Sequence, residues 1–176
     1  MNLQNGDAVV FNGPKLPLEK KRFPLYEDIG DYDAIVETTL ATVCGSDVHT
    51  WLGHRPFPTP CILGHEMVGK IIAIGNNLKT DFNGEKLGIG DKVVWSMTVG
   101  CGECFFCKKE LPQKCTKMFK YGHVKSDEKP HFTGGFAKYV HLKKGSYIFK
   151  VSSELSDEEV APLMCAGSTI ISGLDY

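Results

Sequence analysis

Residues that bind metals or move protons are concentrated between Cys44 and Glu66, where a thiol, a hydroxyl, carboxylates and imidazoles lie close together along the chain. Cysteine and histidine together suit a borderline-soft ion such as zinc, and catalytic zinc sites usually draw their ligands from separate segments. We predict that Cys44, His65 and the later Cys165 bind one zinc ion and leave its fourth position to water or substrate. Such a position lets zinc polarise an alcohol or a carbonyl group.

Four polar residues beside this ligand set could assist the chemistry. Ser46 and His49 could pass the proton of a bound alcohol to solvent, because a hydroxyl and an imidazole each donate and accept. Asp47 could orient His65 through the ring nitrogen that does not bind metal. Glu66 could approach the zinc as a transient ligand or set the local electrostatics. Taken singly, such residues are commonly buried thiols, helix caps or surface histidines, so the prediction depends on their grouping.

A second concentration of cysteines lies between residues 101 and 115, which we call the cysteine lobe. Its spacing, C-x2-C-x2-C-x7-C, allows four thiolates to close tetrahedrally around one structural zinc ion. The lobe has little apolar material, so metal binding should supply most of its folding free energy. An iron-sulfur cluster or two disulfides are the less favoured alternatives. The predicted ligands are Cys101, Cys104, Cys107 and Cys115.

Composition narrows the class of protein. The 176 residues include 20 Lys and Arg and 21 Asp and Glu, for a net charge of −1, and neither sign forms a run. Binding to nucleic acid or to an anionic membrane surface is therefore not expected. Residues 1–13 lack a secretion-signal pattern, and no stretch approaches the roughly 20 apolar residues of a membrane span. Together with the clustered thiols, this favours one domain in the cytoplasm.

The elements that must position these residues are mostly short strands. Apolar or β-branched patterns predict strands over residues 7–12, 33–43, 67–74, 92–97 and 136–142. A short helix capped by Ser46 should run through Leu52, and the capping-box spacing of Ser156 and Glu159 predicts a helix from about Asp157. A further helix is predicted over residues 166–176. The pattern favours a mainly β fold with a few short helices and a barrel-like form.

Several motifs together resemble the medium-chain zinc-dependent alcohol dehydrogenase family. The resemblance implies a GroES-like, partly open β-barrel catalytic domain with a zinc-binding lobe. It also implies interconversion of an alcohol and an aldehyde or ketone by hydride transfer to NAD or NADP, with the alcohol activated as a zinc alkoxide. Two zinc ions per chain and a homodimer or homotetramer are expected. The motifs are the segment from Cys44 to His49, Gly64-His65-Glu66, Gly90-Asp91-Lys92-Val93, the cysteine lobe, Gly134-Gly135-Phe136-Ala137 and the segment from Ala161 to Gly167.

By position in these motifs, Cys44, His65 and Cys165 are similar to the family's catalytic zinc ligands. Glu66 is similar to the neighbouring acid, and Ser46 and His49 to a proton relay that also borders the cofactor. Polyol and threonine dehydrogenases of this family tend to have an acidic residue at the position of Cys165. The cysteine at position 165 is therefore more similar to the residue that the simple alcohol dehydrogenases have there.

The resemblance also bears on domain organisation. Residues 1–176 should form one catalytic domain, with the structural zinc in the lobe at 101–115. Family members continue into a Rossmann domain with a G-x-G-x-x-G turn, and no such unit occurs in this sequence. We therefore expect a truncated chain that is inactive alone, with the choice between NAD and NADP made elsewhere.

A weaker resemblance concerns the substrate. Residues 59–66, 112–115 and 120–123 are similar to a subgroup of these enzymes associated with phosphonate catabolism. A small hydroxyalkyl- or aldehyde-phosphonate would then be the substrate, and Arg55 with His54 could contact the anion through charge-assisted hydrogen bonds. A solvated loop arginine is an equally good explanation of Arg55.

Two other functions remain open at this point. The chain could be a catalytically silent, zinc-stabilised β-domain that serves as an interaction module, or a relative of the quinone reductases, which share the fold without zinc. Zinc content distinguishes them. Two ions per chain fit the dehydrogenase, one fits the module and none fits the reductase.

Overall fold

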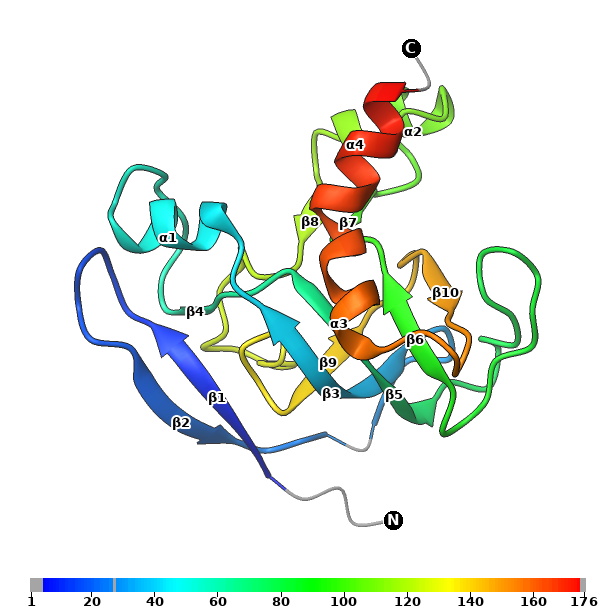
Figure 1. Ribbon diagram of the computed structural model, residues 1–176, viewed down its shortest axis with the longest axis horizontal. Coiled ribbons are helices and arrows are strands. Elements are labelled where there is room, and N and C mark those ends of the chain that lie inside the picture. The colour runs from blue at the N-terminus through cyan, green and yellow to red at the C-terminus, as the bar shows by residue number, and fades with distance from the viewer. Residues whose placement is uncertain (1–4, 27, 175–176) are drawn as a thin grey trace.

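The computed structural model describes residues 5–26 and 28–174, and short β-strands dominate it (Figure 1). The strands are β1 (Gly6–Phe11), β2 (Glu19–Phe23), β3 (Ala34–Thr42), β4 (Cys61–Ile62), β5 (Glu66–Ile74), β6 (Lys92–Trp95), β7 (Thr98–Val99), β8 (Phe119–Lys120), β9 (Tyr139–Leu142) and β10 (Ile148–Lys150). The helices are α1 (Gly45–Trp51), α2 (Phe105–Lys108), α3 (Asp157–Val160) and α4 (Ala166–Leu174), with 3-10 turns η1 (Pro112–Lys114) and η2 (Ala161–Met164). The prediction of a mainly β fold with a few short helices is confirmed.

The strands form three antiparallel sheets that do not close into a complete barrel. Their orders are β10-β6-β5-β3-β9, β2-β1-β4 and β7-β8. The segment 136–138 joins the two larger sheets. The Lys138 N–H donates to the Asp7 carbonyl of β1 at 2.8 Å, and the Lys138 carbonyl accepts from the Thr38 N–H of β3 at 2.9 Å. The partly open arrangement agrees with the predicted architecture.

Strands β3 and β5 bring the two ends of the Cys44-to-Glu66 stretch together. The β-branched residues of β3 favour an extended chain, and its antiparallel register with β5 runs from Ala34 opposite Ile74 to Thr42 opposite Glu66. The end of β3 therefore lies beside the beginning of β5. Cys44 follows the one and His65 precedes the other, so the sheet register itself brings these two residues to the same edge.

The hydrophobic core lies against the five-stranded sheet. Val36, Met67, Trp95 and Val140 come from four of its strands, and each is at most 1% exposed. Full burial of an apolar side chain of this size stabilises a fold by about 1.5–3 kcal/mol. The sheet is thus a rigid support for the loops that leave its edge.

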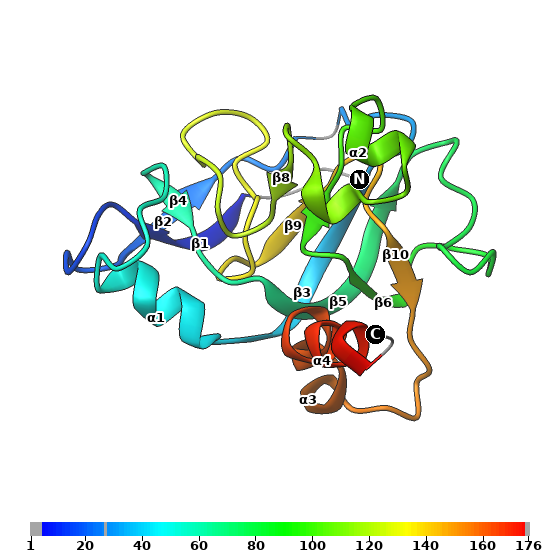
Figure 2. The same ribbon diagram turned by 90° about the horizontal axis from the view of Figure 1, so that it is seen from above.

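The C-terminal helices are attached to this sheet through η2. Ser156 caps α3 as predicted, with its hydroxyl accepting from the Glu159 N–H at 3.3 Å and its own N–H donating to the Glu159 carboxylate at 2.7 Å. The Met67 N–H of β5 donates to the Met164 sulfur at 3.2 Å, which fixes the end of η2 and the position of Cys165 after it. Beyond Cys165, α4 extends away from the sheets (Figures 1 and 2).

Some element boundaries differ from the predictions. Helix α1 has Cys44 rather than Ser46 at its N-cap, because the Asp47 carboxylate accepts from the Cys44 N–H at 3.0 Å. The predicted strand over 136–142 begins only at Tyr139, and that over 92–97 ends at Trp95. The helix predicted to residue 176 is observed to Leu174, and its last two positions lie outside the described residues. In the described part of the chain, no helix has the length and apolar character to cross a bilayer.

The carboxylate of Asp81 stabilises the loop between β5 and β6 by accepting hydrogen bonds from backbone N–H groups. Its carboxylate, 7% exposed, accepts from the N–H groups of Asn83 and Glu85 at 2.8 Å each and of Lys150 at 3.0 Å. Replacement of Asp81 by Ala should lower the free energy of unfolding near neutral pH by about 1–3 kcal/mol, because three backbone donors lose their acceptor. Chemical denaturation measures the change, with the exposed Asp127→Ala as control.

The Asp81 contribution should also depend on pH in a defined direction. Burial alone would raise the pKa of this carboxyl, but the backbone donors, led by Lys150, hold it below its ordinary value of 3.8. A lowered pKa in the folded state means that the stabilisation is fully present above the unfolded pKa and is lost as pH falls through the folded one. The difference between wild type and Asp81→Ala should therefore shrink below about pH 4. A difference independent of pH would contradict this account.

Candidate functional site

The structure brings Cys44, His65 and Cys165 together from three separate segments. Their sulfur and ring-nitrogen atoms all lie within 4.8 Å of one another. A tetrahedral zinc ion with bonds of about 2.0–2.3 Å separates its ligands by roughly 3.3–3.8 Å, so modest side-chain shifts would close the site. His65 is buried and both thiols are half-buried. The donor types, their number and their spacing fit a zinc site with one position left for another ligand.

Asp47 connects the segments that form this cluster. It is 3% exposed, and its carboxylate accepts from the Cys44 N–H at 3.0 Å and from the Gly64 N–H at 3.3 Å. Its Oδ1 also lies 3.3 Å from Nδ1 of His65, a long contact that is ionic in character rather than a well-aligned hydrogen bond. Asp47 therefore lies on the Nδ1 side of the ring, where it was predicted to act, and leaves Nε2 for the metal.

The ionisation of the cluster follows from burial and from these contacts. Burial raises the pKa of Cys165 to about 11, and the neighbouring Cys44 adds to the effect. Burial also acts to raise the pKa of Cys44, but hydrogen bonds from Ser46 and His65 outweigh it and hold that pKa below the usual thiol value. For His65, burial would lower the pKa, yet Asp47 raises it overall. Cys44 is therefore the thiol that ionises more readily.

The two residues of the predicted proton relay lie in different surroundings. Ser46 Oγ is 3.2 Å from Nε2 of His65, directly at the cluster. His49 is exposed on α1, and its Nδ1 lies 3.2 Å from Nδ1 of His54. Among the described residues, no hydrogen bond joins Ser46 to His49. A proton leaving Ser46 would need a water molecule or a substrate hydroxyl to reach the imidazole.

Glu66 is buried next to His65. Among the described residues, the candidate ligand group contains Cys44, His65 and Cys165 and does not include Glu66. Its Oε2 accepts a hydrogen bond of 2.7 Å from the Thr42 hydroxyl, across the end of the β3–β5 pair. The Glu66 charge adds to the raising of the Cys165 pKa and partly opposes the lowering of the Cys44 pKa. In this arrangement its influence on the cluster is electrostatic.

The cysteine lobe has the geometry of a closed four-thiolate site. The Cys101 and Cys107 sulfurs are 4.0 Å apart and those of Cys104 and Cys115 are 3.9 Å apart, close to the roughly 3.8 Å edge of a tetrahedral zinc-sulfur site. Backbone N–H groups point at the sulfurs, as where Cys101 and Lys117 donate to Cys115 at 3.2 and 3.3 Å. Such donors favour thiolates. They are the main reason that the pKa of Cys104 falls to about 6.

The turn from Lys120 to His123 lies beside the cluster, and the sequence did not predict this position. His123 is 5% exposed, and its ring centroid lies 5.1 Å from that of His65. The adjacent Gly122 has φ of 76°, and a Cβ atom there would lie 2.6 Å from the Gly64 carbonyl oxygen, so close backbone contact requires glycine. Lys120 begins the same turn, with its carbonyl accepting from the His123 N–H at 3.1 Å. Only the tertiary contact shows that this turn borders the cluster.

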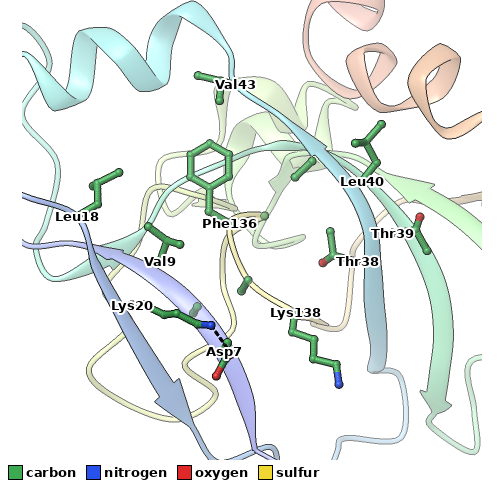
Figure 3. Close-up of a pocket in the computed structure, with 14 residues that line it drawn as sticks. Asp7, Val9, Leu18, Lys20, Thr38, Thr39, Leu40, Val43, Phe136 and Lys138 are labelled. Atoms are coloured by element: carbon green, nitrogen blue, oxygen red, sulfur yellow. Dashed lines mark ion pairs between the residues drawn. The ribbon is translucent and has the colours of Figure 1, made fainter.

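A separate groove of about 710 Å³ lies between β1, β2 and β3. Figure 3 shows its apolar end, formed by Leu18, Val43 and Phe136, and its polar end, where Lys20 pairs with Asp7 at 2.9 Å. Val43 immediately precedes Cys44, but the lining of the groove includes none of the candidate ligands. The groove is thus a neighbour of the candidate centre rather than part of it.

The importance of Asp47 can be tested by its replacement with Asn. The amide keeps the volume but places an N–H₂ group against backbone donors and removes the charge beside His65. We expect the affinity of the three-ligand centre for zinc to fall roughly 10- to 100-fold. Competition with a chelator measures it, while the four-cysteine zinc should be retained. The exposed Asp28→Asn is the matched control, and an Asp47→Asn protein with wild-type zinc affinity would refute the orienting role.

Comparison with known proteins shows the family to which the chain belongs. A family model described as the alcohol dehydrogenase GroES-like domain matches residues 30–153. The chain is 33% identical over 158 residues to zinc-type alcohol dehydrogenase B of Aspergillus flavus, covering 89% of this chain and 34% of that protein. It is also 33% identical over 150 residues to a probable cinnamyl alcohol dehydrogenase of Zea mays, covering 84% of this chain and 39% of that one.

Solved structures show the same fold. An alcohol dehydrogenase from Thermotoga maritima superposes with a TM-score of 0.91 at 36% identity, covering 98% of this chain and 48% of that chain. The structure of CAD from Helicobacter pylori complexed with NADP(H) gives a TM-score of 0.80 at 28% identity, covering 98% of this chain and 48% of that chain. The chain thus spans between about a third and a half of the length of these relatives. Taken with the matched family model, these similarities establish that the chain belongs to the medium-chain zinc-type alcohol dehydrogenase family and comprises its GroES-like domain.

Proposed function

We propose that this chain is the catalytic part of a zinc-dependent oxidoreductase that interconverts an alcohol and an aldehyde or ketone by hydride transfer to NAD or NADP. The observation that carries the proposal is the convergence of Cys44, His65 and Cys165 on one point, with their ligand atoms within 4.8 Å and Asp47 behind the imidazole. A domain that served only as a scaffold would need no three-ligand centre beside its closed four-cysteine lobe.

Zinc held at this centre would supply Lewis acidity, which lowers the pKa of an alcohol hydroxyl and so favours loss of hydride from its carbon to the nicotinamide. The residues of the chain do the rest. Asp47 fixes the orientation of His65. Ser46 Oγ, 3.2 Å from the imidazole, is the group placed to accept the hydroxyl proton of the alcohol and release it toward His49 and solvent.

The remaining parts of the proposal concern cofactor, metal content and assembly. The structure of the Helicobacter pylori relative contains NADP(H), which supports a nicotinamide cofactor for this chain without deciding between NAD and NADP. We propose two zinc ions per chain, one in each ligand group. We also propose a cytoplasmic enzyme, since the cysteine lobe needs reduced thiols, and assembly into a homodimer or homotetramer.

The test uses a chimera in which this chain replaces the corresponding half of the Thermotoga maritima enzyme, with which it superposes at a TM-score of 0.91. We expect the chimera to reduce NAD or NADP when given a primary alcohol, and the chain alone to show little turnover. Ser46→Ala should lower turnover roughly 100-fold with zinc content unchanged. Ser46→Thr should restore much of it, because the hydroxyl returns.

The exposed Ser153→Ala is the control variant and should leave turnover as it was. A folded chimera that contains both zinc ions but oxidises no alcohol with either cofactor would overturn the proposed function. Unchanged turnover in Ser46→Ala would remove Ser46 from the proton path while leaving the zinc chemistry in place.

A further inference from the structure

Two cationic side chains near the candidate catalytic centre have no carboxylate partner. Across residues 5–26 and 28–174, neither Lys120 nor Arg55 belongs to an ion pair. Other lysines of the chain do, as with Lys92, Lys117 and Lys150, whose ammonium groups lie 2.7–2.9 Å from a carboxylate. Positive side chains that lack a carboxylate partner can attract anions.

Arg55 is connected to the centre by a row of rings. Its guanidinium carbon lies 5.4 Å from the centroid of Phe57, whose ring meets His123 edge-on at 4.2 Å between centroids. His123 in turn lies 5.1 Å from His65, a candidate zinc ligand. These contacts form a row that leads from His65 at the candidate centre through His123 and Phe57 to the guanidinium of Arg55. Stacking on an aromatic face also limits the freedom of an otherwise exposed arginine.

Lys120 lies at the end of β8, where it pairs with Thr98 of β7, and begins the turn that leads to His123. The side chain is half-buried, and burial is the main cause of a pKa below the usual value for lysine. The charge of Arg55 lowers this pKa further, while Cys165, Cys44 and Asp47 raise it. The geometry agrees with this, because the His123 N–H donates to the Lys120 carbonyl at 3.1 Å and the His123 ring contacts both Phe57, which contacts Arg55, and His65. Holding two like charges together is unfavourable, and a bound anion would relieve the repulsion.

We propose that Lys120 and Arg55 form a subsite for a small oxyanion beside the Cys44, His65 and Cys165 centre, so that the preferred substrate is an alcohol or aldehyde carrying a carboxylate or phosphonate group. This inference rests on the proposed function, which supplies the reacting hydroxyl at the metal centre. The planar guanidinium can bind two oxygens at once, and the ammonium can bind a third as a compact charge. His54 is not needed, because it is already in contact with His49.

The test is binding of three small alcohols to the zinc-loaded chain, measured by calorimetry. Glycolate and hydroxymethylphosphonate carry the two kinds of oxyanion, and glycolamide is their neutral counterpart. We expect both anions to bind at least tenfold more tightly than glycolamide. Lys120→Gln and Arg55→Gln should each remove roughly a tenfold or larger part of that preference, since each deletes a charged hydrogen bond. Lys120→Arg should restore it, which a merely structural role of Lys120 would not predict.

Lys125→Gln is the matched control, because it removes the same charge from an exposed position further along the same loop. Equal loss in this variant would mean that only net charge matters and would overturn the subsite. ADP-ribose, the phosphate-bearing part of the cofactor, is a fourth titrant, and a Lys120→Gln effect confined to it would reassign the cations to cofactor binding. Anions that bind through the zinc alone would be insensitive to both variants. Absence of binding by all three alcohols would count against the zinc chemistry itself, whereas equal binding by all three would overturn only the subsite.

Discussion

Replacement of Cys104 by Ala is expected to release one of the two zinc ions proposed for the chain and to unfold the cysteine lobe. The four sulfurs already lie at nearly tetrahedral separations, with opposite pairs 3.9 and 4.0 Å apart. Little else holds residues 101–115 together, since α2 has no buried residue and Phe105 is 69% exposed. Zinc binding supplies about 10–16 kcal/mol of folding free energy in small zinc-finger peptides, so loss of a ligand should remove most of the local stability.

Elemental analysis should then give one zinc per chain instead of two, and hydrogen exchange should become fast across the lobe while the five-stranded sheet remains protected. Cys61→Ala is the matched control. Cys61 is the one cysteine outside both ligand groups and is fully buried, so this variant should lower the melting temperature and keep both ions. A Cys104→Ala protein with two zinc ions and a protected lobe would show that the four thiols are not a metal site.

The four-cysteine centre could be predicted from the sequence because its ligands are local. Four thiols within 15 residues can meet without any knowledge of the rest of the fold, and only their spacing is needed. The second centre is different. Cys165 is 100 residues beyond His65, and nothing in the local pattern indicates that η2 docks on β5 through Met164 and Met67. The prediction that Cys165 and His65 bind the same metal came from the resemblance to a family and not from the periodicity of the sequence.

Other features depend on tertiary contacts and could not be predicted from the sequence. Strand β2, with the sequence Glu-Lys-Lys-Arg-Phe, has no apolar alternation, and it forms because β1 offers an edge and Asp7 pairs with Lys20 and Arg22. The role of Asp47 also depends on tertiary contacts. As a helix residue it would ordinarily cap α1, but only the approach of Gly64 and His65 gives its second oxygen a role in the centre.

The contact between His49 and His54 illustrates the same limit. Sequence spacing puts His49 on the helix that carries Ser46, which makes a relay between them reasonable. The turn at the end of α1 returns His54 over the helix, where the His54 N–H donates to the His49 carbonyl at 2.9 Å and the two rings meet. A relay through His49 is thus a prediction about a state with substrate or water present, and the Ser46 variants test its first step.

Replacement of Cys165 by Ser is expected to reduce the zinc content from two ions to one, this time by emptying the three-ligand centre. A serine hydroxyl is a poor zinc ligand, and the two remaining donors, Cys44 and His65, cannot hold the ion alone. Because the pKa of Cys165 without metal is about 11, zinc must displace a proton to bind it, and affinity for this ion should fall as the pH is lowered.

Cys165→Asp separates loss of a ligand from loss of structure, since a carboxylate can bind zinc and the acidic residue common in related polyol dehydrogenases resembles this replacement. We expect two zinc ions in Cys165→Asp, one in Cys165→Ser, and similar melting temperatures for both variants, because the half-exposed side chain contributes little to the core. Elemental analysis of the three proteins decides the matter. Two ions falling to one would place Cys165 in a metal centre distinct from the lobe. A single ion in wild type, unchanged by either replacement, would mean that this centre does not bind zinc in the chain, and the interaction-module alternative would then become the better account of its function.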